Sequence, residues 1–213
     1  MVTFWERLVQ PHVFFALQAR VGDLRAVNRT RVPWNAIANG QFILTTRTAY
    51  ESVGTHAAVR HAVAEDMELA QAYVRAGRDI FLVYAEAFMR TRMYRSLGEI
   101  VEGWSKNLAI GAPQMLPPFP LARRILPYVM WLPALFWIGP PVAWLFWRSW
   151  WLEGATAASL LTWLEICRRE RAPLWYAFLY PFGAAIVAFI MLRSAWRGGR
   201  KIAWRGRIYR TTG

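Results

Sequence analysis

The sequence predicts an α/β region followed by a group of membrane-spanning helices. Residues 1–120 alternate amphipathic helical segments with short β-branched ones, whereas residues 121–196 consist mainly of long apolar stretches. A proline-rich passage at 113–120 marks the boundary between these two regions, because proline removes backbone donors and keeps the preceding residue out of a helix. We therefore expect a domain over 1–120, transmembrane helices over 121–196 and a basic tail over 197–213.

The first region has the strand, helix, strand alternation of α/β domains. Gln41–Arg47 and Asp79–Ala85 have the β-branched or apolar composition of strands. Apolar residues recur at helical spacing over Phe4–Gln18 and over His61–Ala76, and Gly77 stands where the second of these helices should end. A sheet of two strands is not stable alone, so we expect the remaining strands to come from outside these residues.

Ser96–Ile110 is predicted to be a helix, for which two environments are open. Apolar side chains, Trp104 among them, occupy one side, and Glu99, Glu102 and Lys106 occupy another. This pattern is typical of a helix that lies in the membrane interface. A helix packed on a soluble domain would show the same pattern.

Three segments of the second region are candidates for membrane spans. Ile125–Phe146 has no charge across 22 residues and Pro173–Leu192 none across 20, each enough for a hydrocarbon core of roughly 30 Å. Leu152–Cys167 is a third, weaker candidate because it carries Glu153 and Glu165. The chain also contains 13 Trp and 12 Phe, and aromatic residues are enriched where a protein meets the bilayer interface.

The positive charge of the chain is concentrated in its most apolar half. Residues 1–120 carry 13 Lys or Arg against 10 Asp or Glu, a net of +3, and residues 121–213 carry 13 against 3, a net of +10. These arginines flank apolar runs, where they can meet lipid headgroups. We therefore expect lipid phosphate, and not nucleic acid, as the counter-charge.

Two basic clusters conflict over membrane topology. Residues 168–171, "RRER", and the tail both favour the cytoplasmic side under the positive-inside rule. They cannot both be cytoplasmic if Pro173–Leu192 crosses the membrane between them. We place the tail in the cytoplasm and leave the number of crossings open.

Glu65 and Asp66 are the candidate catalytic carboxylates. Their place at a predicted helix start has a structural interpretation, since the helix dipole stabilises a nearby carboxylate by roughly 0.3–1 kcal/mol. Other polar residues around them favour a functional one, because sugar transfer from a nucleotide donor needs a carboxylate base, polar groups for the acceptor and arginines for a diphosphate. These further candidates are Asn39, Gly40, Gln41, His56, Arg92 and Arg95.

The segment "NGQFILTTRTAYESVGTHAAVRHAVAEDMELAQAYVRAG" followed by "RMYRSLGEIVEGWSKN" resembles the acceptor half of family 2 glycosyltransferases. The branch includes ceramide glucosyltransferases and bacterial hopanoid or carotenoid glycosyltransferases, and "WRGRIY" (Trp204–Tyr209) is similar to the tail motif of its bacterial members. The resemblance runs from about residue 4 to 210. It implies a partial glycosyltransferase A-type (GT-A) domain over 1–120. It also implies hexosyl transfer, with inversion, from a nucleotide sugar such as a UDP-sugar to a lipid hydroxyl.

The resemblance also implies roles for single residues. Asp66, beside Glu65, matches the aspartate that removes the proton from the acceptor hydroxyl. Arg92 and Arg95 match the first and fourth positions of the "(Q/R)xxRW" element, which helps to hold the donor diphosphate, and Ser96 replaces its tryptophan. The segment Asn39, Gly40 and Gln41, with His56, matches the acceptor and donor-sugar side.

One element of the family pattern is missing from this sequence. Family members hold a divalent metal through an aspartate pair in "DxD" spacing, and the aspartates here, Asp23, Asp66 and Asp79, form no such pair. We therefore expect no metal or other cofactor on this chain. Mg²⁺ or Mn²⁺ is expected only through a donor-binding N-terminal half, on a longer native chain or on another polypeptide.

The sequence leaves two functions open. In the first, the chain is a membrane-bound glycosyltransferase fragment, inactive alone, integral to a bacterial inner membrane and with its catalytic face in the cytoplasm. In the second, it is a non-enzymatic membrane anchor or interaction module derived from such an enzyme. A transporter would need polar residues within its spans, and Glu153 and Glu165 lie near span ends, which disfavours it.

Overall fold

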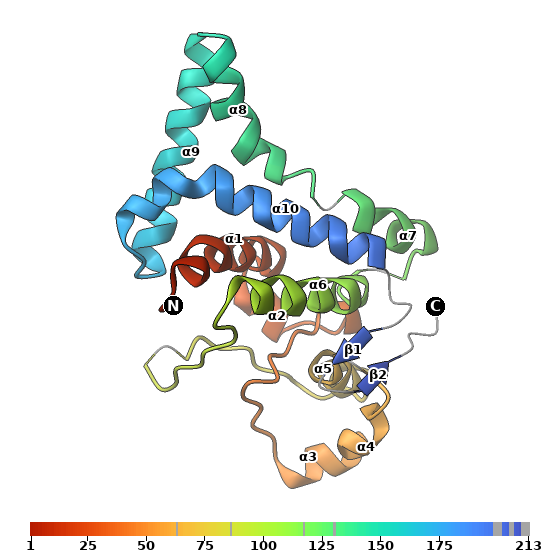
Figure 1. Cartoon of the computed structure of the whole chain (residues 1–213). Helices are drawn as coiled ribbons and strands as arrows, with labels where there is room; N and C mark the ends of the chain where they lie inside the picture. The colour runs from red at the N-terminus through yellow and green to blue at the C-terminus, as the bar shows by residue number, and fades with distance from the viewer. Residues whose placement is uncertain are drawn as a thin grey trace. The chain divides into compact units, whose positions relative to one another are not determined.

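A computed structural model describes residues 1–62, 64–85, 87–116, 118–129, 131–197, 202–204 and 207–209 (Figure 1). These residues are mainly helical. They form two compact units that interleave along the sequence. Unit 1 comprises Met1–Arg20, Arg92–Ser105 and Tyr128–Trp196, and unit 2 comprises Val21–Thr91, Lys106–Pro127 and Arg197–Gly213.

Unit 1 is built from long helices. They are α1 (Phe4–Val21), the first half of α6 (Leu97–Gln114), α8 (Ala134–Phe146), α9 (Trp150–Arg169), the 3-10 helix η2 (Leu174–Leu179) and α10 (Tyr180–Arg197). In Figure 1, α8 and α9 lie side by side as a hairpin, and α10 leaves the base of this hairpin and runs alongside α1.

An aromatic cluster forms the core of unit 1 at the base of the hairpin. The indole of Trp163 on α9 is 1% exposed and stacks on the imidazole of His12 on α1, with ring centroids 3.7 Å apart. Trp137 on α8 and Tyr180 on α10 pack on the same indole, at centroid distances of 5.5 and 6.4 Å. One tryptophan therefore joins four helices, and burial of such large rings is a major stabilising contribution.

Two glycines allow close helix packing in unit 1. A Cβ at Gly183 of α10 would overlap the ring of His12 and lie 2.6 Å from the carbonyl oxygen of Leu8, so α10 can approach α1 this closely only with glycine there. A Cβ at Gly103 of α6 would overlap the ring of Tyr94. Both glycines are explained by close approach and not by an unusual backbone conformation.

The face of α6 that was expected to meet either membrane or protein is covered by protein within unit 1. Ile100 is fully buried, and Trp104 is buried with its ring 6.2 Å from that of Phe14 and 6.0 Å from that of Tyr94. This packing favours the second environment for residues 97–105.

Unit 2 consists of short helices and long irregular connections. Its elements are α2 (Leu24–Asn28), the 3-10 helix η1 (Pro33–Asn35), α3 (Arg47–Ser52), α4 (Thr55–Val59), α5 (Glu65–Arg75), the second half of α6, α7 (Pro120–Val129), β1 (Ile202–Trp204) and β2 (Arg207–Tyr209). Its core forms around α5, where Leu69 and Tyr73 pack with Val59, and Ala70 and Val74 pack with Ala36.

The helix predicted over His61–Ala76 is confirmed for α5, Glu65–Arg75, although it begins four residues later. Its end follows the predicted signal, because Gly77 takes a left-handed φ of +70° and donates its N–H to the carbonyl of Val74 at 3.0 Å. Glycine adopts this conformation without steric cost, which makes it a common helix stop.

The prediction of an α/β, GT-A-type domain is wrong for this chain. Neither Gln41–Arg47 nor Asp79–Ala85 forms a strand. The strands that the structure does describe, β1 and β2, pair antiparallel in the tail, with Ile202 opposite Tyr209.

The physical reason is that neither segment has a neighbouring strand to pair with in the part of the chain that the structure describes. In the second segment the backbone N–H and carbonyl of Leu82 bond instead to the side-chain amide of Asn28, at 2.7 and 3.1 Å. Apolar side chains of both segments stay exposed, among them Leu44 at 86% and Phe81 at 79%. Strand propensity without a partner strand therefore produced no sheet.

The expected membrane spans are only partly reproduced as helices. Residues 125–146 do not form one helix, because α7 ends at Val129 and α8 begins at Ala134 after a turn at 131–133. Leu174–Trp196 is helical, and it is long and apolar enough to cross a membrane. The third candidate segment lies within α9, which continues to Arg169.

Candidate functional site

The structure brings Asp66 together with the Asn39–Gln41 segment. Asp66 lies in the first turn of α5, and its Oδ2 accepts a hydrogen bond of 2.8 Å from the backbone N–H of Gly40. Its Oδ1 accepts one of 2.8 Å from the N–H of Met67. A carboxylate oxygen has two lone pairs, so each oxygen keeps one for a further partner.

Gly40 is what allows the loop to lie against this carboxylate. A Cβ at Gly40 would stand 3.2 Å from Oδ2 and 3.3 Å from Cβ of Asp66, closer than ordinary side-chain contacts. The loop itself is a turn, because the side-chain oxygen of Asn39 accepts the N–H of Gln41 at 3.2 Å and its carbonyl accepts the N–H of Phe42 at 3.2 Å. An Asx turn of this kind replaces the start of the expected strand.

Glu65, Asp66 and Glu68 place three carboxylates in the first turn of α5. The positive end of the helix dipole stabilises them, so the structural interpretation of the Glu65–Asp66 pair holds. Asp66 differs from Glu65 in its contact with the 39–42 turn, while Glu65 is exposed. The arrangement therefore singles out Asp66 as the carboxylate with a defined orientation.

His56 is held by a tyrosine and not by the carboxylates. Its Nδ1 lies 2.5 Å from the phenol oxygen of Tyr50, and its backbone N–H donates to the same oxygen at 2.9 Å. The turn that places it begins at Gly54, whose φ of +80° is left-handed. His56 is exposed, and its Nε2 faces no partner among the described residues.

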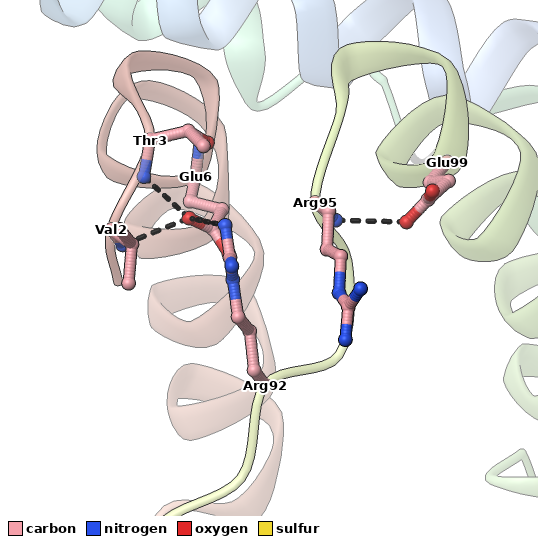
Figure 2. Close-up of polar contacts among 6 residues, drawn as sticks. All are labelled: Val2, Thr3, Glu6, Arg92, Arg95 and Glu99. Carbon is pink, nitrogen blue, oxygen red and sulfur yellow. Dashed lines mark hydrogen bonds and ion pairs between the residues drawn. The ribbon is translucent and has the colours of Figure 1, made fainter.

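Arg92 forms an ion pair that the sequence analysis did not foresee. Figure 2 shows its side chain pointing at Glu6 in the first turn of α1. Its Nε donates to Oε1 of Glu6 at 2.8 Å and its Nη2 to Oε2 at 3.3 Å. The Glu6 side chain is fully buried, whereas that of Arg92 is 39% exposed. A guanidinium has five N–H donors, so the pair leaves Nη1 of Arg92 available to an anion.

Glu6 is held as a carboxylate by four donors. Besides Arg92, the backbone N–H groups of Val2 and Thr3 donate to its Oε2 at 2.8 and 2.5 Å. The hydrogen bond from Arg92, followed by those from this first turn, outweighs burial and lowers the pKa of Glu6 to about 2. The same pair raises the pKa of Arg92, so both groups are charged at neutral pH.

A sequence signal for Glu6 does exist. The hydroxyl of Thr3 accepts the N–H of Glu6 at 3.3 Å while the carboxylate of Glu6 accepts the N–H of Thr3, which makes a capping box at the start of α1. The pattern of Thr or Ser followed three residues later by Glu indicates such a box. It could have identified Glu6, but nothing local indicates that Arg92 would join it.

The guanidinium of Arg95 has no partner among the residues that the structure describes. The backbone N–H of Arg95 donates to Oε2 of Glu99 at 2.8 Å, while its exposed side chain extends away from Glu99 (Figure 2). Ser96, which stands where the family has tryptophan, accepts the N–H of Glu99 on its hydroxyl at 3.2 Å. Ser96 therefore caps α6, and this is its evident role.

The predicted site residues fall into two groups. Asn39, Gly40, Gln41, His56, Glu65 and Asp66 belong to unit 2, and Arg92 and Arg95 belong to unit 1. The structure defines the geometry within each group. Among the described residues no set of three His, Cys, Asp or Glu side chains could hold a metal ion.

Comparison of the chain with protein families, curated proteins and solved structures finds no match.

Proposed function

We propose that this chain is the acceptor-side part of a membrane-bound glycosyltransferase that transfers a sugar from a nucleotide sugar to a lipid hydroxyl. Asp66 acts as the base that takes the proton from the acceptor hydroxyl as that oxygen attacks the anomeric carbon, and the nucleotide diphosphate leaves from the opposite face. The observation that carries this proposal is the oriented carboxylate of Asp66, fixed by the N–H of Gly40 and left with lone pairs toward solvent.

The two arginines supply positive charge that stabilises the anionic nucleotide diphosphate as it leaves. Among the described residues the guanidinium of Arg95 has no partner, and Arg92 bonds to Glu6 through Nε and Nη2, which fixes its orientation and leaves Nη1 for an anion. Charged hydrogen bonds from guanidinium groups to a diphosphate are among the stronger polar interactions in proteins. In the proposed enzyme Arg95 binds the diphosphate directly and Arg92 assists from an oriented position.

A second polypeptide, or a further part of the native chain, supplies donor and metal binding. Unit 2 exposes apolar side chains on two segments, Phe42 and Leu44 on one and Phe81, Val83 and Tyr84 on the other. Contiguous exposed apolar groups mark surfaces that another protein surface covers. The proposed complex buries these segments and brings a Mg²⁺ or Mn²⁺ site, since the described residues of this chain form no group of three His, Cys, Asp or Glu that could hold a metal.

The enzyme works at the cytoplasmic face of a bacterial inner membrane. Support comes from the apolar helix Leu174–Trp196 and from the arginines that flank the apolar segments of residues 121–213. A lipid acceptor resides in that membrane, so anchoring the chain there keeps its site at the acceptor surface.

A second candidate function is a membrane anchor or interaction module without catalysis. The ion pair of Arg92 with Glu6 favours it, because half of the predicted diphosphate pair is already neutralised inside the protein. The two functions make different predictions for Asp66, since an anchor does not need a carboxylate at that position.

The test uses lipid extracts of the native host, compared by mass spectrometry. Deletion of the gene should remove a glycolipid, the wild-type gene should restore it, and Asp66→Asn should not. Glu51→Gln is the matched control, because Glu51 is also a helix carboxylate and pairs only with Arg47 among the described residues. Restoration by Asp66→Asn would favour the anchor, and a glycolipid profile unaffected by deletion would refute the enzyme.

A further inference from the structure

Residues 79–84 of unit 2 have the exposure pattern of an edge strand, although they pair with no strand among the described residues. Ile80 packs against the core around α5 and Leu82 is half-buried, whereas Phe81 and Val83 are 79% and 67% exposed. Alternation with a period of two residues is that of an extended chain with one face on a core. The segment is therefore already arranged for strand pairing.

One edge of this segment is occupied by a side chain. The amide of Asn28 accepts the N–H of Leu82 on Oδ1 at 2.7 Å and donates from Nδ2 to the carbonyl of Leu82 at 3.1 Å. A neighbouring antiparallel strand would bond to Leu82 in the same way, through one acceptor and one donor. Asn28 therefore takes the place of a strand on this edge.

The opposite edge of the segment is open. In an extended chain the N–H and C=O groups of successive residues point to opposite edges, so those of Phe81 and Val83 point away from Asn28. The backbone of neither residue makes a hydrogen bond within the part of the chain that the structure describes. An edge of this kind accepts a further strand, which satisfies its backbone groups. A lipid surface or a helix offers no such row of donors and acceptors.

The open edge is complementary to the same edge of a second copy of the chain. With a two-fold axis at Leu82, Phe81 lies opposite Val83 of the second copy, and each of the two such pairs exchanges two backbone hydrogen bonds. The side chains of each pair become cross-strand neighbours. An aromatic ring beside a β-branched side chain is a favourable combination in antiparallel sheets.

The charges around this edge favour a second copy over a strongly charged partner. Residues 21–91, which contain the edge, carry 8 Lys or Arg against 7 Asp or Glu, a net of +1, although the whole chain has a net charge of +13. Residues 80–85 carry no charge. In the sequence Arg78 precedes them and Glu86 follows them, so antiparallel pairing brings unlike charges to the same end. Two copies can therefore approach at this edge without repulsion.

We propose that two copies of this chain pair through residues 79–84, antiparallel, with the two-fold axis at Leu82. The pairing covers Phe81 and Val83, and it leaves the segment of Phe42 and Leu44 for the part of the complex that binds the donor. It does not depend on the proposed glycosyl transfer.

The pairing is tested by removing one backbone donor. Val83→Pro deletes the N–H that bonds to the second copy, which has no partner among the described residues of one chain, and proline is tolerated on the open edge of a strand. Val83→Ala is the matched control, because it shortens the same side chain and keeps the N–H. In sedimentation experiments in detergent, the wild type and Val83→Ala should dimerise as the concentration rises, and Val83→Pro should dimerise at least about tenfold more weakly. A monomeric wild type, or equal dimerisation of Val83→Pro, would overturn the proposal.

The register is tested with cysteines in a Cys167→Ala chain, which keeps every backbone donor of the edge. Phe81→Cys and Val83→Cys chains that carry different tags are mixed and oxidised. Opposite residues have Cα atoms about 5.5 Å apart, within the range of a disulfide, whereas the same residue on both copies is about 8 Å apart, beyond that range. Only the mixture should therefore form the cross-linked dimer. Cross-linking of either chain alone, or none in the mixture, would overturn the proposal. The glycolipid assay uses neither readout, so failure of the proposed function is recognised separately.

Discussion

The two compact units differ in how their polar groups are held. In unit 1 the polar side chains of Glu6 and His12 are buried and packed, with Glu6 accepting from four donors and His12 stacked on Trp163. In unit 2 the candidate site depends on a few hydrogen bonds at an exposed turn, and apolar segments beside it stay in solvent. The difference indicates that unit 1 is specified by its own packing, whereas unit 2 presents a surface suited to a partner.

The largest effect should come from closing the space between α1 and α10. Gly183→Val introduces a Cβ that overlaps His12, so we expect a loss of about 1–3 kcal/mol in the free energy of unfolding from overpacking. Gly154→Ala is the control, because nothing lies within 4 Å of its added Cβ. Thermal unfolding in detergent measures both, and equal stability of the two variants would contradict tight packing in unit 1.

Acidification should destabilise unit 1 through His12 and Glu6. Burial lowers the pKa of His12 to about 3 from 6.5. The unfolded chain therefore binds a proton that the folded chain does not, and stability present above pH 6.5 is lost as the pH falls toward 3. Glu6, with a folded pKa of about 2 against 4.5, adds a loss below pH 4.5.

The measurement is the melting temperature from pH 7.5 to pH 4. His12→Gln should flatten the dependence between pH 6.5 and pH 4.5. An identical pH profile for His12→Gln and the wild type would remove His12 as the cause.

A smaller effect on stability, but a large one on the site, is expected for Gly40→Ala. Its Cβ would press on Asp66, and the exposed loop can move away, so stability should change by no more than about 0.5 kcal/mol while the hydrogen bond to Asp66 is lost. Hydrogen exchange of residues 39–42 should quicken, and Gly111→Ala, with open space around it, should not change it. Unchanged exchange in Gly40→Ala would show that the loop is not held by Asp66.

The smallest effect is expected for Tyr50→Phe. It removes two hydrogen bonds to His56 at an exposed position, where a substitution changes the free energy of unfolding by less than about 0.5 kcal/mol. The His56 imidazole should become mobile, which an NMR spectrum of the ring protons would detect. A ring signal as sharp as in the wild type would mean that other contacts hold His56.

The helices with strong local signals could be predicted from the sequence. The apolar spacing of Met67, Ala70 and Val74 and the stop at Gly77 identified α5, and the uncharged run from Pro173 identified α10. The strands at Gln41–Arg47 and Asp79–Ala85 could not, because strand propensity is fulfilled only when a neighbouring strand takes the backbone hydrogen bonds. The hydrogen bond between Asp66 and the N–H of Gly40 joins two candidate site residues through a turn that the sequence did not predict.

The sequence by itself determined the division of the chain into a charged, amphipathic first region and an apolar second region. It also determined the helical periodicity of α5 and α10 and the basic residues that flank the apolar region, since all of these depend on residues within a few helical turns. Only the tertiary structure decided that Arg92 pairs with Glu6, 86 residues away, and that the absence of a side chain at Gly183 lets α10 pack against His12 of α1. The ion pair of Arg193 on α10 with Glu102 on α6 was decided in the same way. Such contacts depend on which distant segments meet in space, and no local spacing encodes that.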